Sequence, residues 1–244
     1  MVNPQRFLVC ADNIRPQKNF GQWIMDHDFW HAKWTRNEIG FHLDEVNPLL
    51  TQHFSALKLP PGSRVFLPLC GKTRDILWLL DQGYRVVGAE LSPLAVNQLF
   101  AELKIAPSIT DLGKYQRYST EDLDIWVGDI FDLTADDLSV VDAIYDRAAL
   151  VALPEAMRVR YAEHLTALTS HAPQLLITFE YDQSRMSGPP FSIPDEEVHR
   201  HYANHYQLNA LDRCEVAGGL KGKCPAIEHV WLASHHDKRN AGAS

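Results

Sequence analysis

The stretch of residues 64–90, RVFLPLCGKTRDILWLLDQGYRVVGAE, constrains the fold of this chain more than any other. Residues 65–69 are a short apolar run typical of a buried strand, and residues 70–72 follow as a tight turn. Apolar residues then recur on one broad face of a helix, and residues 86–89 form a second apolar run that ends on Glu90. This order of strand, turn, helix and strand predicts half of a nucleotide-binding α/β unit.

The turn of this unit favours a ligand without phosphate groups. Gly71 lets a ligand approach the backbone at a helix N-terminus, and Glu90 lies about 20 residues further on, where such folds place an acid on ribose hydroxyls. The turn has one glycine rather than the three of a dinucleotide fingerprint, and Pro68 and Leu69 make it apolar. Two interpretations stay open from these residues: a nucleoside-type cofactor site, or a plain turn of an α/β core.

Composition limits the possible partners. The 244 residues suffice for one α/β domain, and the net charge of −8 argues against nucleic acid or an anionic membrane as the main partner. No apolar run reaches the length of a membrane span. The four cysteines form no CxxC pair and no disulfide framework, which favours a reducing, cytoplasmic location.

The rest of the chain alternates predicted strands and helices, with residues 105–122 expected to be irregular. This alternation, without a repeat or a linker, predicts one three-layer α/β domain. Strands are expected at 124–127, 140–145 and 175–179, and an antiparallel pair at 208–214 and 227–233 is expected to close one edge. Helices are expected at 44–57, 92–102, 154–170 and 194–206.

The two ends are expected to lie outside the domain, which is assigned to residues 25–235. Residues 1–24 mix polar residues with prolines and show no sustained period, so they are interpreted as a flexible N-terminal arm or as extra sequence upstream of a start at Met25. The polar residues 236–244 are expected to be a frayed tail.

Residues 28–42 are dense in aromatic side chains. Trp30 and Trp34 are four apart and share a helix face, and Phe41 follows shortly after. The spacing alone favours a helix that docks two tryptophans on the core. The alternative is a lid whose rings stack on a flat or cationic ligand.

Other candidate site residues follow predicted strands, because ligands of open α/β sheets bind at the carboxyl ends of the strands. Asp129 and Ile130 follow the strand at 124–127, where they are placed to contact an adenine edge and face. Arg147 follows the strand at 140–145 and is either a rim salt-bridge partner or an anion-binding residue.

No metal site is expected. Helical pairs of histidines can bind zinc, but here they occur in polar segments without acidic or cysteine partners at supporting spacings. These histidines are His27, His31, His199, His201 and His205.

The motifs taken together resemble one family. They are FWxxxW from Phe29, GFH from Gly40, PLCGK from Pro68, VGxELS from Val87, IFDL from Ile130, DRxAL from Asp146 and GPPF from Gly188. From residue 28 to residue 232 the chain resembles the thiopurine S-methyltransferases, particularly the bacterial branch. The resemblance implies a Rossmann-like class I methyltransferase fold, mostly parallel with an antiparallel edge, and S-adenosylmethionine as methyl donor.

The resemblance also implies roles for individual residues. Family cofactor contacts fall on Trp34, Leu69, Glu90 and Arg147, with Gly71 in the turn between them. Trp30 begins the lid segment, and Asp129 and Ile130 correspond to the adenine side. Phe41 and Arg147 stand where family members contact the substrate, and Arg147 is expected to stabilise the substrate anion. One departure affects substrate preference: Lys221 and Lys223 occupy a loop that often carries arginine in the family.

The expected reaction is an in-line transfer of a methyl group to an aromatic or heterocyclic thiol of the thiopurine type by a monomeric enzyme. Selenium or tellurium species, halide or thiocyanate are alternative acceptors. A non-catalytic nucleoside-binding module is the alternative from another class.

Overall fold

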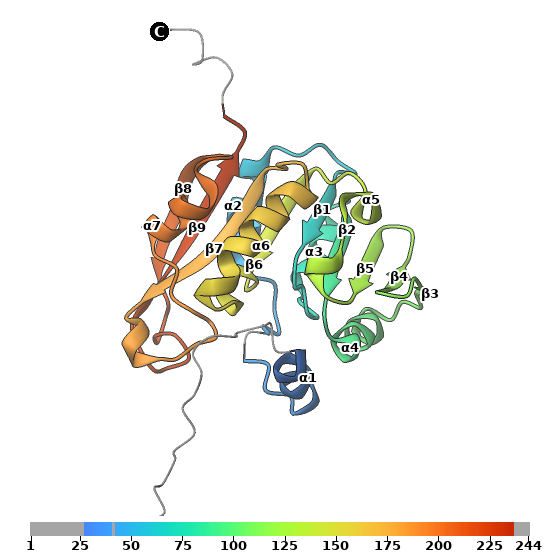
Figure 1. Cartoon of the computed structure of the whole chain (residues 1–244), viewed down its shortest axis with the longest axis horizontal. Coiled ribbons are helices and arrows are strands. Elements are labelled where there is room, and N and C mark those ends of the chain that lie inside the picture. The colour runs from blue at the N-terminus through green and yellow to red at the C-terminus, as the bar shows by residue number, and fades with distance from the viewer. Residues whose placement is uncertain (1–26, 41, 237–244) are drawn as a thin grey trace, which may run out of the picture.

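A single mixed sheet is the frame of the structure (Figure 1), a computed structural model that describes residues 27–40 and 42–236. Within these residues the sheet has nine strands in the order β3-β4-β5-β2-β1-β6-β7-β9-β8. The predictions for residues 1–24, for Phe41 and for residues 237–244 lie outside the described residues, and the assignment of one domain to residues 25–235 stays a prediction.

The centre of the sheet is parallel, as the apolar runs indicated. β2 pairs with β5 and β1, β1 with β6, and β6 with β7, so the carboxyl ends of five strands meet at one edge. The strands are β1 (Arg64–Leu67), β2 (Arg85–Glu90), β5 (Leu123–Val127), β6 (Ala143–Arg147) and β7 (Gln174–Tyr181). β6 lies later in the chain than the predicted 140–145, since Val140 is 83% exposed and precedes it.

Antiparallel strands close both sides of the sheet. The predicted pair is confirmed as β8 (Gln207–Glu215) and β9 (Ala226–Ser234), with β9 paired to β7. The prediction of irregular structure for residues 105–122 is wrong, because β3 (Ser108–Asp111) and β4 (Gln116–Ser119) form a hairpin on β5. All four residues of β3 are exposed, so the hairpin lacks the alternating burial that identifies a strand in a sequence.

Helices cover both faces and complete the three layers. One face carries α2 (Pro48–His53), η1 (Phe54–Leu57), α3 (Asp75–Asp81) and α4 (Pro93–Leu103). The other carries α5 (Ala135–Leu138), α6 (Glu155–Leu168) and α7 (Asp195–Tyr202). Short elements α1 (His27–Thr35), η2 (Ile130–Asp132), η3 (Leu150–Ala152) and η4 (Gln183–Arg185) lie in the connections. None of the described helices is long and apolar enough to cross a membrane.

Local signals set the start of two helices. Ser92 caps α4 by accepting the Ala95 N–H at 3.4 Å, and Pro93 occupies the first turn, so the helix begins within one residue of the predicted 92. Asn47 caps α2 in the same way, accepting the Leu49 N–H at 2.8 Å, so this helix begins at Pro48, four residues after the predicted 44.

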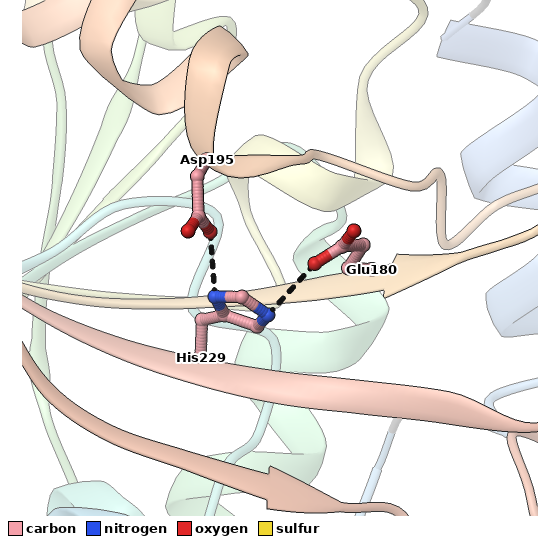
Figure 2. A group of neighbouring side chains, drawn as sticks. All are labelled: Glu180, Asp195 and His229. Carbon is pink, nitrogen blue, oxygen red and sulfur yellow. Dashed lines mark ion pairs between the residues drawn. The ribbon is translucent and has the colours of Figure 1, made fainter.

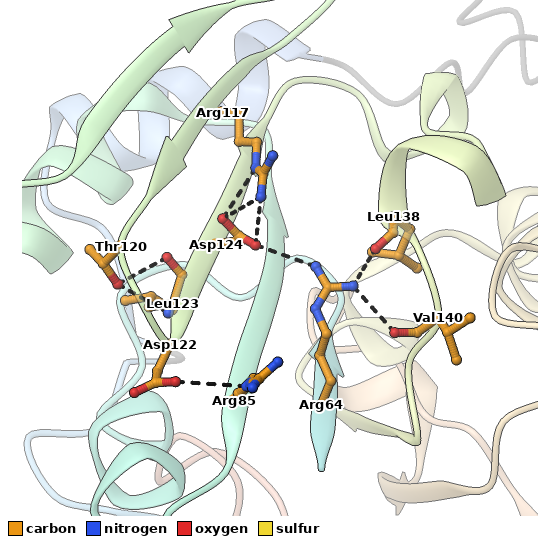
Figure 3. A network of polar contacts seen from close by, with 9 residues as sticks. All are labelled: Arg64, Arg85, Arg117, Thr120, Asp122, Leu123, Asp124, Leu138 and Val140. Atoms are coloured by element: carbon orange, nitrogen blue, oxygen red, sulfur yellow. Dashed lines mark hydrogen bonds and ion pairs between the residues drawn. The ribbon is translucent and has the colours of Figure 1, made fainter. Parts of the chain in front are cut away.

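The amino edge of the parallel strands carries a network of paired charges (Figure 3). Asp124 at the start of β5 accepts hydrogen bonds from Arg117 at 2.9 Å and from Arg64 at 3.4 Å. The backbone N–H of Arg64 donates to Asp142 at 2.7 Å. Burial alone would raise the pKa of Asp124, but the hydrogen bonds from Arg117 and Ser119, with the guanidinium charges, outweigh it and lower that pKa.

Candidate active site

A cavity of about 630 Å³ opens at the carboxyl edge of the sheet, the opposite end from the paired charges. Five of the predicted site residues line it: Trp30, Trp34, Leu69, Glu90 and Arg147. Gly71, Asp129 and Ile130 do not line it, and Phe41 lies outside the described residues. Its size falls in the range of small-molecule sites, and its walls are mostly apolar and aromatic.

The turn after β1 is held in an unusual backbone conformation beside the cavity. Leu69 has a φ of +47° and Gly71 a φ of +54°, both in the left-handed region. Close packing also requires Gly88 on β2, because a Cβ there would lie 2.7 Å from the Cys70 Sγ and 2.6 Å from Ile125 Cδ1. The strained backbone of Leu69 lies at the cavity that this residue lines, and local strain of this kind collects at functional sites.

Glu90 ends β2 as a buried carboxylate held by backbone groups. Its Oε2 accepts the Gly71 N–H at 2.8 Å and its Oε1 accepts the Ser92 N–H at 2.8 Å. Burial raises the pKa of Glu90, and the backbone hydrogen bonds from Ser92, Gly71 and Leu91 oppose that rise. Each carboxylate oxygen keeps acceptor capacity for a further donor.

A second buried acid, Asp75, was not predicted from the sequence. It lies in the first turn of α3, where its Oδ1 accepts the Asn47 N–H at 2.8 Å and its Oδ2 accepts the Tyr145 hydroxyl at 3.1 Å. Burial, followed by the Asp75 charge, raises the pKa of Tyr145 well above its usual value. An acid just after a predicted turn was the available signal, but its partners come from other elements.

These acids decide which cofactor the turn suits. The Gly71 N–H is already donated to Glu90, and Asp75 places negative charge at the start of α3. A phosphate would meet repulsion and find that N–H engaged, whereas sugar hydroxyls would find a buried carboxylate. The residues present therefore fit a nucleoside group without phosphates.

α1 lies outside the sheet (Figure 1), and its residues Phe29, Trp30, Lys33 and Trp34 line the cavity. Trp34 is 4% exposed and Trp30 is partly buried against the core, so both tryptophans face inward as their spacing predicted. His27, at the start of α1, lies 3.2 Å from Asp129 Oδ2, which ties the helix to the segment after β5. α1 both contacts the core and lines the cavity. Docking of the two tryptophans on the core is therefore compatible with a role of this helix as a lid.

Asp129 has a structural role in addition to its contact with α1. Its Oδ1 caps η2 by accepting the Phe131 N–H at 2.9 Å, and Ile130 is 2% exposed within the core. Gly128 pairs with the last residue of β2, donating to the Glu90 carbonyl at 2.9 Å. The pair of predicted adenine-side residues thus lies next to Glu90 along the sheet edge without lining the cavity, and its role stays a prediction.

Arg147 is the last residue of β6 rather than a residue after the strand, and its half-buried side chain lines the cavity. Among residues 27–40 and 42–236 its guanidinium makes no hydrogen bond or ion pair, so the rim salt bridge weighed for it is not formed there. Glu228 on β9 lines the same cavity, and the charge of Arg147 opposes the rise that burial causes in the pKa of Glu228. A guanidinium without a partner in an apolar cavity is suited to an anionic ligand.

Asp146 points to the other face of β6 from Arg147. It is fully buried, accepts the Tyr161 hydroxyl at 2.8 Å and the Leu150 N–H at 3.1 Å, and carries no ion pair among the described side chains. Burial, partly offset by these hydrogen bonds, raises the pKa of Asp146 to about 6. The Asp-Arg pair therefore places one charge in the core and the next in the cavity.

The two lysines of the loop between β8 and β9 differ. Lys221 lines the cavity and donates to the Pro189 carbonyl at 2.8 Å, which anchors the Gly-Pro-Pro segment at the cavity wall. Lys223 lines a separate surface pocket. The residue as a whole is exposed, but partial burial of its ammonium group, then the charges of Lys223 and Lys33, lowers the pKa of Lys221. Cationic groups thus approach the cavity from β6, from this loop and from α1.

One group of described residues could be considered for a metal ion, and it does not involve the predicted histidine pairs. Glu180, Asp195 and His229 lie together on β7, α7 and β9 (Figure 2). The Nδ1 of His229 is 2.7 Å from Asp195 and its Nε2 is 3.1 Å from Glu180, although neither contact is a well-aligned hydrogen bond. Arg213 also contacts Glu180 at 3.0 Å. Each ring nitrogen of His229 faces a different carboxylate, whereas a metal ion bound through one nitrogen would lie on that nitrogen's side of the ring.

Comparisons with known proteins identify the family of the chain. The family model described as thiopurine S-methyltransferase matches residues 25–236. A thiopurine S-methyltransferase of Xanthobacter autotrophicus is 58% identical over 209 residues, covering 85% of this chain and 98% of the relative. One of Teredinibacter turnerae is 55% identical over 212 residues, covering 87% and 99%.

A solved structure shares the fold at much lower identity. The 1,6-didemethyltoxoflavin-N1-methyltransferase of Burkholderia thailandensis, solved with 1,6-didemethyltoxoflavin and S-adenosylhomocysteine, superposes with a TM-score of 0.57. It is 16% identical and covers 85% of this chain and 87% of its own.

Proposed function

The chain belongs to the thiopurine S-methyltransferase family, with its Rossmann-like class I fold and S-adenosylmethionine as methyl donor, and we propose that it methylates the sulfur of aromatic or heterocyclic thiols. The observation that carries this choice of acceptor is the Arg147 guanidinium, which has no partner among the described residues and lines a cavity with aromatic walls. A flat thiolate supplies both the negative charge and the apolar surface that such a cavity accepts.

The residues that would hold the cofactor surround the turn after β1. Glu90 would accept hydrogen bonds from the ribose hydroxyls, and Leu69 and Trp34 would pack on the cofactor's apolar parts. Asp129 and Ile130 would lie on the adenine side, with Trp30 above the site. When bound, S-adenosylmethionine supplies a methyl group on a sulfonium that a nucleophile displaces in line.

Arg147 would act on the acceptor rather than on the departing group. Its positive charge favours the thiolate over the thiol, and each unit by which it lowers the acceptor pKa is worth about 1.36 kcal/mol. Heteroaryl thiols are more acidic than the ~8.5 of cysteine, so they need less of this help. Phe41 would contact the acceptor from the lid side.

The lid and the apolar walls would supply alignment and exclude water. Holding two reactants in line is worth roughly 7–11 kcal/mol in favourable cases. Charge is neutralised as the thiolate and the sulfonium react, so a dry cavity should favour the transition state. The aromatic residues of α1 that line the cavity would serve this task.

One incubation tests the acceptor. The protein is mixed with S-adenosylmethionine and, separately, with heteroaryl thiols, alkyl thiols, selenium and tellurium species, iodide and thiocyanate, and products are read by mass spectrometry. Methylated heteroaryl thiols should form fastest. Rapid turnover of the inorganic acceptors alone would overturn the proposal in favour of the alternative acceptors, and cofactor binding without any product would favour a binding module.

We also propose a reducing compartment, a small-molecule substrate and a monomeric enzyme. The three described cysteines, Cys70, Cys214 and Cys224, carry free thiols, and the net charge is −8. Free thiols are expected where glutathione keeps cysteines reduced, and a negative protein disfavours nucleic acid. Sedimentation of the purified protein tests the monomer.

A further inference from the structure

Four acidic side chains of the described residues line the cavity: Glu38, Asp75, Glu90 and Glu228. Three of them are engaged by the protein. Glu38 contacts Lys33 at 2.6 Å, Asp75 accepts two hydrogen bonds, and Glu90 accepts two backbone N–H groups. The carboxylate of Glu228 makes no hydrogen bond or ion pair with any residue in the described part of the chain, although the side chain is half-buried.

The strand register places Glu228 on the same face of the sheet as Arg147. Arg147 is paired with Ile177 on β7, and Ile177 is paired with Val230 on β9. Glu228 precedes Val230 by two residues and is paired with Phe179, so its side chain points to the same side, one step nearer the carboxyl edge. The guanidinium and the carboxylate therefore flank one part of the cavity, yet they are not within ion-pair distance of each other.

Two other titratable groups whose pKa values respond to the charge of Glu228 are poor proton acceptors at neutral pH. Tyr145 on β6 and Cys214 on β8 have raised pKa values, first because of burial, and the charge of Glu228 contributes to both. Asp75 already accepts the Tyr145 hydroxyl. The pKa of Glu228 is itself raised by burial, with the charge of Arg147 opposing the rise. A carboxylate with a raised pKa is better matched to take up a proton than an exposed one.

We propose that Glu228 is the proton acceptor for the thiol substrate, in partnership with Arg147, and this rests on the proposed thiol methylation. The S–H proton passes to the Glu228 carboxylate, which becomes a neutral carboxylic acid, while Arg147 holds the thiolate. The thiolate sulfur then forms the new bond to the methyl carbon, and the electron pair of the broken bond remains on the donor sulfur. Glu228 afterwards releases its proton to water.

This role makes a prediction that depends on the acidity of the acceptor. A thiol with a pKa near ~8.5 is mostly protonated at neutral pH and needs the base, whereas an acidic heteroaryl thiol is already ionised. Below the raised pKa of Glu228 the carboxyl group is protonated and cannot accept, so the rate with weakly acidic thiols should fall in acid through that pKa.

The test compares wild type, Glu228→Gln and Glu228→Asp with thiols of graded acidity. For weakly acidic thiols at neutral pH, Glu228→Gln should lower kcat/KM about 100-fold, a common contribution of general base catalysis, and Glu228→Asp should recover part of it. For acidic thiols Glu228→Gln should leave kcat/KM nearly unchanged. In the Gln variant the rate with weakly acidic thiols should follow the thiolate fraction in solution across pH.

A second measurement does not require turnover. With S-adenosylhomocysteine present, the absorbance of a bound heteroaryl thiol reports whether it is thiol or thiolate, and the wild type should bind more of the thiolate at a given pH than Glu228→Gln does. Glu215→Gln, an exposed acid on β8 outside the cavity, is the matched control. Urea unfolding checks that the variants are folded.

The outcomes separate the two proposals. Equal losses for acidic and weakly acidic thiols would show that Glu228 only positions Arg147, and unchanged rates would exclude any role, so either result overturns the proton-acceptor role. If the wild type methylates no thiol, the proposed function fails instead.

Discussion

The acidic side chains at the two edges of the parallel sheet differ in their ion pairing and in the direction of their pKa shifts. At the amino edge, Asp124 joins the guanidinium groups of Arg64 and Arg117, and its pKa is lowered (Figure 3). At the carboxyl edge, burial raises the pKa of Glu90, Asp146 and Glu228, none of which forms an ion pair with another described residue.

The difference has a thermodynamic meaning. A paired acid with a lowered pKa stabilises the native state at neutral pH, whereas a buried acid with a raised pKa reduces its stability there. The ion-paired acid at the amino edge therefore stabilises the fold. The acids at the carboxyl edge have no ion-pair partner among the described residues and can interact with a ligand instead. Substitutions at the two edges should consequently change different quantities.

The largest effect is expected from Arg147→Met at the carboxyl edge. Turnover of a weakly acidic thiol should fall about 100- to 1,000-fold, the loss typical of removing one group that stabilises developing or resident negative charge. The free energy of unfolding should hardly change, because the guanidinium has no partner in the described part of the structure. Steady-state rates and urea unfolding measure the two quantities.

Arg117→Met is the matched control at the amino edge. It should keep turnover and lower the free energy of unfolding by about 1 kcal/mol, because Arg117 is partly exposed in its contact with Asp124. If the two arginine variants lose stability equally, or lose turnover equally, the two edges of the sheet do not have different roles.

Asp146→Asn should change the pH dependence of stability. The folded pKa of about 6 exceeds the ordinary value of 3.8, so between these values the native state retains a proton that the unfolded state releases. The contribution of Asp146 to the free energy of unfolding is therefore largest below pH 3.8. It falls by about 3 kcal/mol as the pH rises to about 6. Denaturant titrations at several pH values should show that the Asn variant lacks this fall. If the stabilities of wild type and variant change with pH in the same way, Asp146 is not a buried acid without an ion pair.

Glu90→Ala should weaken binding of the cofactor by about 1–3 kcal/mol, the range for lost hydrogen bonds to a charged group. Calorimetry with S-adenosylhomocysteine measures this directly. Glu102→Ala on α4 is a suitable control, since Glu102 contacts Lys72 but does not line the cavity. Unchanged affinity in the Glu90 variant would remove the ribose assignment.

Asp124→Asn should lower the free energy of unfolding by about 1–2 kcal/mol at neutral pH without altering turnover. The lowered pKa of Asp124 means that its contribution is present above the ordinary value of 3.8 and is lost as the pH falls through the folded pKa. The wild type and the variant should therefore converge in stability below 3.8. If the difference in free energy of unfolding between wild type and variant is the same at every pH, packing rather than the charge of Asp124 stabilises these strands.

The smallest effect is expected from Lys221→Met. It should raise KM for an anionic thiol by a small factor, worth less than about 1 kcal/mol, because the lysine is exposed. Lys223→Met, which removes a neighbouring charge outside the cavity, should leave KM unchanged. If both variants raise KM equally, the loop acts only through its overall charge.

Much of the site was accessible from the sequence because its signals are local. The turn after β1, the acid at the end of β2 and the Ser-Pro cap of α4 lie within residues 64–93, where backbone conformation and side-chain periodicity decide the structure. The hairpin of β3 and β4 escaped prediction for the opposite reason. Its residues are largely polar and exposed, so it is specified by pairing with β5 rather than by burial.

By itself the sequence determined the parallel α/β core, the strand ends that carry Glu90 and Arg147, and, through its motifs, the family. Only the tertiary structure decided which charges have partners. Asp75 meets Tyr145 and Asn47 across three elements, and Glu228 comes to the same face as Arg147 through two steps of strand register. Burial and pairing depend on segments far apart in the chain, so the chemistry of an acid cannot be read from its neighbours in sequence.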